Sequence, residues 1–310
     1  MTAGFVHPAV FYRSDEEYLA MLRPFVTEGL AAAHAVAVAV PGRRLDLVRD
    51  SLGDLAHDVE WIDMAEAGRN PGTIIPTVLR RFADAYLGRY VRIVGEPVWP
   101  GRGADEYPAC VQHEALINSA FAGRDITIVC PYDVTALEPR QIADARQTHP
   151  LVWEAGERHQ SPQYAPQTAV RRFNLPLPRD SRVAQFVVKV QRDLRAARTF
   201  VAEQAARCGV GSRTADLQLI ATELLSNCLR YASGDSRVRM WCTDEYVVCE
   251  VEGGGNLADP LAGRRPANDG HGRGLLLVNQ LADLVRIYSS GHGTAVAALL
   301  RADRQTDGET

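Results

Sequence analysis

The stretch NDGHGRGLLLVNQLADLV, from Asn268 to Val285, places glycines at alternate positions directly before an apolar run with helical spacing. These glycines are Gly270, Gly272 and Gly274. A loop that holds phosphate groups brings backbone N–H groups close to the phosphate oxygens, and a β-carbon would obstruct that approach. A helix that begins right after the loop adds unpaired N–H groups and the positive end of its dipole. The stretch is therefore typical of a phosphate-binding loop, although clustered glycines also make plain turns.

A polar pair lies upstream of these glycines, in the predicted helix ATELLSNCLRYA (221–232). Glu223 and Asn227 are four residues apart, so both project from one face of that helix, beside apolar residues that predict a core. The carboxamide oxygen of Asn227, together with phosphate oxygens, suits Mg²⁺, which usually keeps several waters. Glu223 is placed to accept a proton from an attacking hydroxyl. The alternative interpretation is a polar contact between two helices.

Composition limits the class of protein. The chain has 310 residues, of which 46% are hydrophobic, and this is enough for two packed cores. The formal net charge of −4 gives no electrostatic reason to expect direct binding of nucleic acid. No apolar run approaches the roughly 20 residues of a membrane span, and the N-terminus lacks a signal-peptide pattern. We therefore expect a cytoplasmic protein without a membrane segment.

The six cysteines are scattered and form no CxxC pair. Several of them fall in apolar patterns, where reduced cysteine packs as a small hydrophobic residue. The spacing predicts neither a disulfide framework nor a zinc cage.

Residues 1–155 alternate strand-like and helical patterns, which predicts an α/β domain with a mostly parallel sheet. The strand-like runs are 34–41, 59–64, 90–98 and 125–133. Residues 156–180 are rich in Pro, Gln and Arg and lack periodicity, so they predict a linker.

Residues 181–303 show a different order of elements. Two helical patterns, within 183–209 and 214–232, precede two strands joined at Asp244 and Glu245. A glycine-rich loop, a helix after Gly274 and a final strand pair complete the domain. This segregation of helices and strands predicts an α+β sandwich, followed by a disordered tail at 304–310.

Together these residues resemble the GHKL ATPase superfamily. Its N-box helix carries Glu and Asn at the spacing of Glu223 and Asn227, and its second glycine box reads GxGxGL. The matching order of elements covers residues 180–301, and Gly293-Thr294 falls where the family places its last nucleotide contact. The resemblance implies the Bergerat fold, ATP and Mg²⁺ as cofactors, Glu223 as the catalytic base and Asn227 as the Mg²⁺ ligand. The implied nucleotide-binding residues are Asn227, Gly255, Gly270, Gly272, Gly274 and Thr294.

Within the superfamily, the short domain looks like the anti-sigma factor serine kinases of Gram-positive bacteria. The motifs IDMAEAGRNPGTIIP, GEPVWPGR, HEALINSAFAG and CPYD look like the MEDS sensory domain that accompanies such kinases in actinobacteria. The resemblance implies an anti-sigma factor that binds a sigma factor and phosphorylates a serine of an anti-anti-sigma (STAS) partner. It also favours a homodimer. A histidine kinase fragment is disfavoured, because no dimerisation helix with an exposed histidine precedes residue 180.

The first glycine box departs from the family pattern DxGxG. In GGGNL (253–257), Gly253 stands where the family has an adenine-binding Asp, Gly255 is retained and Leu257 replaces the second glycine. Strand alternation directs the adjacent Glu252 away from the site. Loss of a charge-assisted hydrogen bond costs about 1.5 to 3 kcal/mol, or about ten- to a hundredfold in affinity. The alternative function is therefore a non-enzymatic sigma-factor or partner-switching module with a degenerate nucleotide site.

In the first domain, candidate ligand-sensing residues lie at or near the carboxyl ends of predicted parallel strands, where ligands settle in open sheets. A small ligand or a metal ion is the expected signal, and the alternative is helix caps and solvated loop residues. No P-loop motif is present, so this half is not expected to be an NTPase itself. The candidates are Asp63, Glu96, His113, Cys130 and Asp133.

Overall fold

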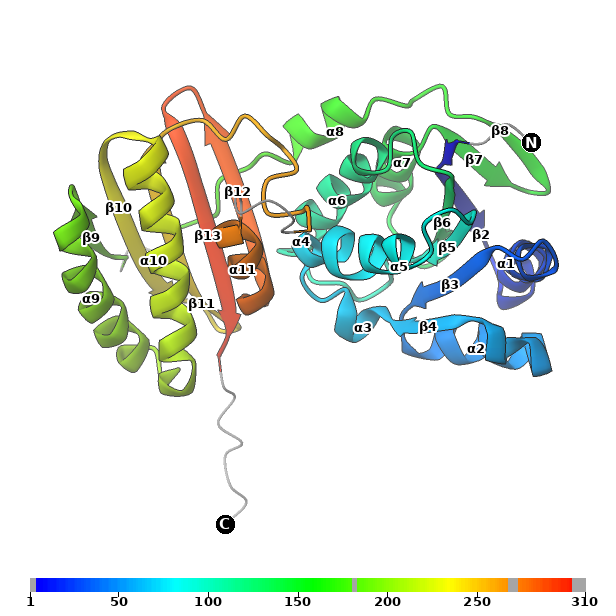
Figure 1. The fold of residues 1–310 in the computed structure, drawn as a ribbon, viewed down its shortest axis with the longest axis horizontal. Helices are drawn as coiled ribbons and strands as arrows, with labels where there is room; N and C mark the ends of the chain where they lie inside the picture. The colour runs from blue at the N-terminus through cyan, green and yellow to red at the C-terminus, as the bar shows by residue number, and fades with distance from the viewer. Residues whose placement is uncertain (1–3, 180–182, 267–272, 303–310) are drawn as a thin grey trace, which may run out of the picture. The chain divides into compact units, whose positions relative to one another are not determined.

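The structure is a computed structural model that describes residues 4–179, 183–266 and 273–302. The chain divides into two compact units, Met1–Phe173 and Asn174–Thr310, which we describe separately (Figure 1). The predicted tail at 304–310 lies outside the described residues. None of the helices in the described part of the chain combines the length and the apolar character needed to cross a membrane.

The first unit is built on an eight-stranded sheet in the order β4-β3-β5-β6-β2-β7-β8, with β1 beside β6. Its strand pairs are parallel except for the antiparallel pair β7–β8, which agrees with the predicted mostly parallel sheet. Strands β1, β2, β7 and β8 are additions to the four predicted runs. The strands are β1 Phe5–Val6, β2 Pro8–Tyr12, β3 Ala35–Val40, β4 Glu60–Asp63, β5 Val91–Gly95, β6 Ile126–Asp133, β7 Leu151–Glu154 and β8 Glu157–Gln160.

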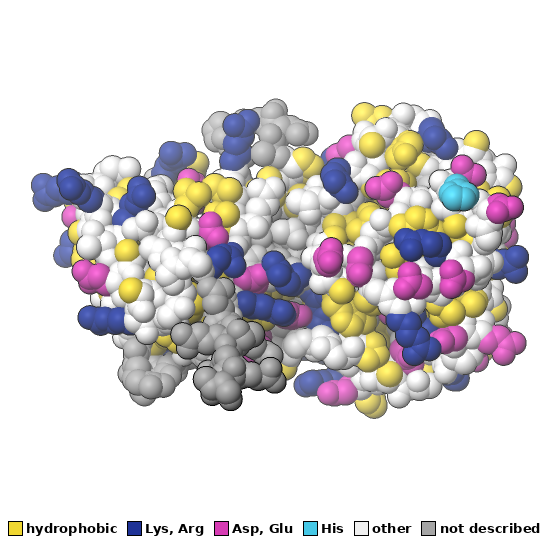
Figure 2. All heavy atoms as spheres, turned by 90° about the horizontal axis from the view of Figure 1, so that it is seen from below, with side chains coloured by type: hydrophobic (Ala, Val, Ile, Leu, Met, Phe, Trp, Pro, Cys, Tyr) yellow, Lys and Arg dark blue, Asp and Glu magenta, His cyan; other side chains and the backbone are white. Residues whose placement is uncertain are grey.

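Helices cover this sheet and bury its strands. All six residues of β3, AVAVAV, are buried, as expected for a strand enclosed on both faces. The first long helix begins where Ser14 accepts a hydrogen bond from the backbone of Glu17. The helices are α1 Asp15–Ala31, α2 Gly42–Leu52, α3 Met64–Ala67, α4 Pro71–Thr73, α5 Arg80–Ala85, α6 Tyr107–Ala120, α7 Pro139–Thr148 and α8 Pro166–Arg172. On the face drawn in Figure 2, acidic and basic side chains are interspersed over this unit.

Much of the predicted linker 156–180 is part of the first unit. Residues 157–160 form β8 and 166–172 form α8, whose Ala169 is fully buried. Pro166 occupies the first turn of α8, where a missing N–H costs nothing. The proline content predicted a loop at a place where the chain in fact begins the helix α8. The boundary between the two units lies after Phe173.

The second unit has a five-stranded antiparallel sheet in the order β12-β13-β11-β10-β9. Figure 1 shows α9, α10 and α11 over one face of this sheet. Their apolar residues join those of the strands in one core. The elements are β9 Ala184–Val188, α9 Leu194–Arg207, α10 Thr214–Tyr231, β10 Ser233–Cys242, β11 Tyr246–Gly254, α11 Arg273–Leu281, β12 Leu284–Ser290 and β13 Gly293–Arg301.

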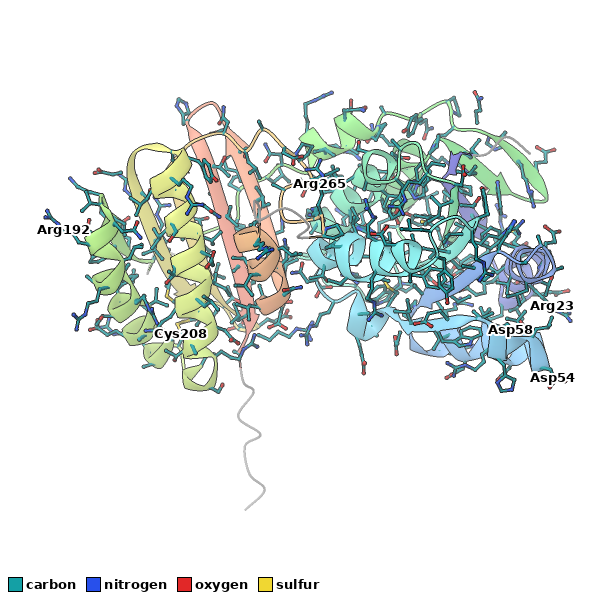
Figure 3. All side chains as sticks on the ribbon, in the orientation of Figure 1. Arg23, Asp54, Asp58, Arg192, Cys208 and Arg265 are labelled. Carbon is teal, nitrogen blue, oxygen red and sulfur yellow. A yellow bond between two sulfur atoms is a disulfide. The ribbon has the colours of Figure 1, made fainter. Side chains whose placement is uncertain are left out.

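Two predictions for this unit are wrong. Residues 184–188 form the edge strand β9 and not the start of a helix, since the β-branched and aromatic run AQFVV suits a strand beside β10. Cys208 and Cys242 form a disulfide bond with their Cα atoms 6.0 Å apart. Cys208 follows the end of α9 (Figure 3), and only the packing of α9 beside β10 brings the two cysteines together. Sequence spacing does not reveal that contact.

Candidate functional site

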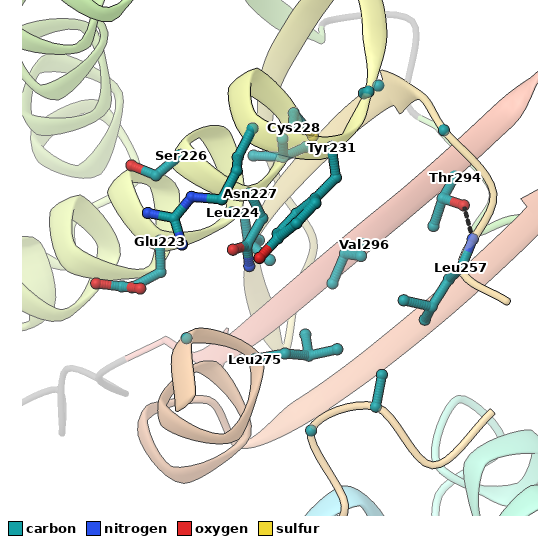
Figure 4. Close-up of a pocket in the computed structure, with 18 of the residues that line it drawn as sticks. Glu223, Leu224, Ser226, Asn227, Cys228, Tyr231, Leu257, Leu275, Thr294 and Val296 are labelled. Carbon is teal, nitrogen blue, oxygen red and sulfur yellow. Dashed lines mark hydrogen bonds between the residues drawn. The ribbon is translucent and has the colours of Figure 1, made fainter. Parts of the chain in front are cut away.

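The second unit contains a cavity of about 670 Å³, bounded by α10, the loop after β11, the start of α11 and β13 (Figure 4). This volume is within the range of cavities that hold cofactors and other small ligands. The lining includes most described residues that the sequence predicts for a nucleotide site. They are Glu223, Asn227, Gly255, Gly274 and Thr294.

Helix α10 supplies three residues of the lining at four-residue intervals, Glu223, Asn227 and Tyr231. This spacing places them on one side of the helix. Neighbouring positions on α10, among them Leu224 and Leu225, are buried in the core. Figure 4 shows Asn227 and Tyr231 on the side of α10 that faces the cavity. The apolar face therefore fixes the helix against the sheet and leaves its polar residues at the cavity.

The last glycine of the opening stretch lies directly against the predicted polar pair. A β-carbon built on Gly274 would lie 2.6 Å from Glu223 Oε2 and 3.3 Å from Asn227 Nδ2. A side chain at this position would therefore require the carboxylate of Glu223 to move, whereas glycine lets α11 begin directly beside the pair. Gly270 and Gly272 lie outside the described residues. The structure thus brings Glu223, Asn227 and Gly274 together, although 47 residues of sequence separate Asn227 from Gly274.

Thr294 connects the glycine-rich loop after β11 to the sheet through a hydrogen bond. Its hydroxyl oxygen accepts a hydrogen bond from the backbone N–H of Leu257 at 3.1 Å (Figure 4) and is hydrogen-bonded to Ser289 Oγ at 2.9 Å. Thr294 also pairs with Gly253 across β13 and β11. This residue therefore holds the Gly255 loop at the edge of the cavity.

Gly253, the residue in place of the adenine-binding Asp, is packed against α10. A β-carbon at Gly253 would lie 2.7 Å from Cys228 Sγ and 3.1 Å from Cys228 Cβ. Helix α10 therefore occupies the space that an aspartate side chain would need. Glu252 is paired with Arg239 and Arg179 and is not part of the described lining, as strand alternation predicts.

The residues of the lining that were not predicted include two arginines, a tyrosine and an aspartate. Arg230 and Arg273 are exposed cations at the cavity, and guanidinium groups suit phosphate oxygens. Arg230 is three residues after Asn227, and Arg273 lies between the predicted Gly272 and Gly274. Their positions beside predicted site residues could therefore have identified both arginines from the sequence. Tyr231 offers an aromatic ring, while Asp259 accepts from Leu261 N and pairs with Arg265. Asp259 belongs to the loop 255–263, and the path of this loop cannot be read from the sequence.

The side chains of the sensory candidates Asp63 and Asp133 accept hydrogen bonds from backbone N–H groups of neighbouring segments. Asp63 accepts hydrogen bonds from the backbone of Ala65 at 2.8 Å and of Gly42 at 3.0 Å. Asp133 accepts from the backbone of Thr135 at 2.9 Å and lies 3.4 Å from Arg44. These are the contacts of helix caps and turns, which is the alternative that the sequence left open.

Glu96 is a buried carboxyl group beside the end of β5. It accepts a hydrogen bond from the Tyr18 hydroxyl at 3.3 Å, and Arg44 and Asp133 are its charged neighbours. Burial raises the pKa of Glu96 to about 8, against the opposing effect of Arg44. At pH 7 this group is therefore mostly protonated.

His113 and Cys130 lie together at a small enclosed cavity with an apolar lining, which Gly95 and Pro97 on either side of Glu96 also line. Cys130 and Glu96 interact electrostatically. Asp63 and Asp133 are not part of the described lining, and Asp133 pairs with Arg44. Cys130 additionally contacts Glu114, the neighbour of the predicted His113, and His7, which was not predicted.

Comparisons with known families agree with this division of the chain. Residues 6–150 match the family model MEDS, described as the MEthanogen/methylotroph, DcmR Sensory domain. Residues 188–299 match the Histidine kinase-like ATPase domain. No curated protein matches the chain. The matches support a protein that joins an N-terminal MEDS sensory domain to an ATPase domain of the GHKL type.

Proposed function

We propose that this protein is an anti-sigma factor that uses Mg-ATP to phosphorylate a serine of an anti-anti-sigma STAS partner. One observation carries the proposal: Glu223, Asn227 and Gly274 converge at a cavity of nucleotide size, inside the region that matches an ATPase family. In this proposal the protein binds a sigma factor, acts in the cytoplasm as a homodimer and is controlled by its sensory unit.

The residues of the cavity fit the cofactor that the family implies. Gly274 lies at the cavity beside α10, and the amide oxygen of Asn227 is a ligand type that Mg²⁺ accepts. Arg230 and Arg273 add positive charge at the cavity. Thr294 and Gly255 bound the part of the cavity formed by the loop after β11. When bound, ATP supplies the phosphoryl group.

Glu223 has the role of general base in this mechanism. A serine hydroxyl at its ordinary pKa is a weak nucleophile, and a carboxylate that accepts its proton activates it. Glu223 is half-buried at the cavity, so a partner's serine can reach it from solvent. Its closeness to Gly274 and Asn227 supports this role, since both belong to the proposed phosphate and Mg²⁺ site.

A second candidate function is a partner-switching module that binds a sigma factor without catalysis. The packing of Gly253 against Cys228 favours it, because the described lining offers no carboxylate at the position where the family binds adenine. This candidate predicts weak nucleotide binding, or none, with sigma-factor binding retained.

Phosphoryl transfer to a partner distinguishes the two functions. The full chain is incubated with Mg²⁺, γ-labelled ATP and candidate STAS proteins from the same genome, each also as a variant with alanine at its predicted phosphorylated serine. We expect label on one STAS protein and none on its alanine variant. If no candidate is labelled at saturating ATP while a sigma factor still binds, the kinase proposal fails and the binding module is the better account.

A further inference from the structure

Four polar side chains meet in the interior of the first unit, among them the sensory candidate Cys130. They come from separate elements: His7 lies between β1 and β2, Glu114 in α6, Cys130 in β6 and His149 between α7 and β7. All four are at most 1% exposed. One potential ligand atom from each residue lies within 4.8 Å of the others. Such burial of polar groups needs a partner that compensates for lost water.

The hydrogen bonds of the two histidines define where their protons lie. His149 Nδ1 is 2.8 Å from the carbonyl oxygen of Ala145, and a carbonyl oxygen only accepts, so Nδ1 carries the proton. His7 Nδ1 is 3.2 Å from Asn118 Oδ1. The amide nitrogen of Asn118 faces the carbonyl of Thr148 at 2.8 Å, which leaves its oxygen to accept from His7. In their neutral forms, both histidines therefore carry a lone pair on Nε2, the nitrogen nearest to Glu114.

Both Nε2 atoms lie near the same carboxylate oxygen. Glu114 Oε2 lies 3.3 Å from His7 Nε2 and 3.4 Å from His149 Nε2. The thiol of Cys130 carries one proton and lies 3.4 Å from His7 Nε2 and 3.6 Å from Glu114 Oε2. The thiol can donate this proton in only one of its contacts. With neutral histidines, at least one close contact therefore joins two hydrogen-bond acceptors that have no proton between them. A cation at the centre of the cluster would compensate for their repulsion.

Four of the six distances between the ligand atoms match a tetrahedral metal site, and all six are within 4.8 Å. Protein ligands about 2.0 to 2.3 Å from a tetrahedral Zn²⁺ ion lie about 3.3 to 3.6 Å from one another. The four distances above, 3.3, 3.4, 3.4 and 3.6 Å, agree with these values. Imidazole, thiolate and carboxylate are all Zn²⁺ ligands. The contacts of His149 with Ala145 and of His7 with Asn118 are of the kind that orient metal-bound histidines.

We propose that His7, Glu114, Cys130 and His149 bind a divalent transition-metal ion, with Zn²⁺ the best match. Four protein ligands and complete burial define a closed, structural site. On binding, Cys130 releases its thiol proton and ligates as thiolate. The ion then connects α6 and the start of β7 to β6 and the N-terminal segment. This site is independent of nucleotide binding in the second unit.

The metal content of the full chain tests this proposal. The protein is purified without chelators and its zinc content is measured by mass spectrometry, with about one ion per chain expected for a closed site. The protein refolded with Co²⁺ should show the visible bands of a tetrahedral site and a thiolate-to-cobalt charge-transfer band. Cys130→Ser should lose the charge-transfer band. Cys110→Ser, which alters another free and buried cysteine of the same unit, should keep it.

If Cys130→Ser does not fold, X-ray absorption at the zinc edge of the unaltered chain can show whether the bound ion has a sulfur ligand. One sulfur ligand with nitrogen and oxygen neighbours is the expected shell. The proposal is wrong if the folded chain contains less than about a tenth of an ion and takes up neither Zn²⁺ nor Co²⁺. It is also wrong if the bound ion has no sulfur ligand, or if Cys130→Ser keeps the charge-transfer band.

Discussion

The two units of this protein place their reactive side chains in opposite environments. In the first unit Glu96, Glu114 and Cys130 are at most 1% exposed. In the second, Glu223 and Asn227 are half-buried and line a cavity of about 670 Å³. A buried group can exchange a proton or an ion, whereas an open cavity admits a nucleotide and a partner's side chain. The same residue types therefore serve different chemistry in the two units.

The largest effect should follow from removal of the carboxylate at the open cavity. Glu223→Ala should slow phosphoryl transfer to the cognate STAS serine by about 10²- to 10⁴-fold, the usual contribution of a general base. Sigma-factor binding should stay close to that of the parent, because the change is confined to the cavity. Glu203→Ala, which removes an exposed carboxylate of α9, is the control. Transfer by Glu223→Ala at the parental rate would make the pair with Asn227 a structural contact.

A smaller effect concerns the space between Gly253 and Cys228. Gly253→Asp alone should destabilise the second unit by about 1 to 3 kcal/mol, since the new side chain meets Cys228 Sγ. Cys228→Ala removes that atom. The double variant Cys228→Ala/Gly253→Asp should recover stability and bind ATP about ten- to a hundredfold more tightly than the parent. Denaturant unfolding and calorimetric titration measure the two effects, and Cys228→Ala alone is the control. Equal ATP affinity in all the variants would show that Gly253 does not face the base.

The closed interior of the first unit should show a pH dependence that originates from Glu96. Burial raises the pKa of Glu96 from 4.5 to about 8, so the folded state binds this proton more tightly than the unfolded chain does. Its contribution to stability is complete below pH 4.5 and is lost as the pH rises to about 8, by at most about 1.4 kcal/mol per pH unit. His7 has the opposite sign, since burial lowers its pKa from 6.5 to about 4. Above pH 6.5 His7 no longer changes the stability with pH, because it is neutral in both the folded and the unfolded chain.

Comparison of the parent with Glu96→Gln between pH 6.5 and 8 isolates the Glu96 contribution. The parent should lose stability over this window, while the variant, which cannot ionise at position 96, should lose less. Urea unfolding followed by tryptophan fluorescence suits the measurement, because Trp61, Trp99 and Trp153 lie in the first unit and Trp241 in the second. Identical slopes for the parent and the variant would contradict the assigned pKa.

Local patterns explain which features were predictable from sequence. The helical spacing of Glu223 and Asn227 and the alternate glycines up to Gly274 predicted one site, and the structure brings these residues together. Spacing cannot reveal contacts that only the fold creates. The bond between Cys208 and Cys242 and the packing of Cys228 against Gly253 depend on how helices lie on the sheet.

The buried cluster of the first unit was predicted only in part, since Cys130 was a candidate but His7 and His149 were not. Its members stand at positions 7, 114, 130 and 149, and no short motif connects them. The parallel order of β6, β2 and β7 brings three of their segments side by side. The helix α8 was missed because its proline and glutamine content resembles that of a linker, although Pro166 is favourable at a helix start.

Calorimetric titration of the full chain with ATP, with and without Mg²⁺, tests most directly whether the open cavity is a nucleotide site. The account predicts saturable binding of about one nucleotide per chain, tighter with Mg²⁺ and weakened in Gly274→Val, whose side chain would meet Glu223 and Asn227. Gly291→Val, at a glycine with open space around it, should bind as the parent does. A folded parent chain that shows no saturable binding at millimolar Mg-ATP would contradict the account.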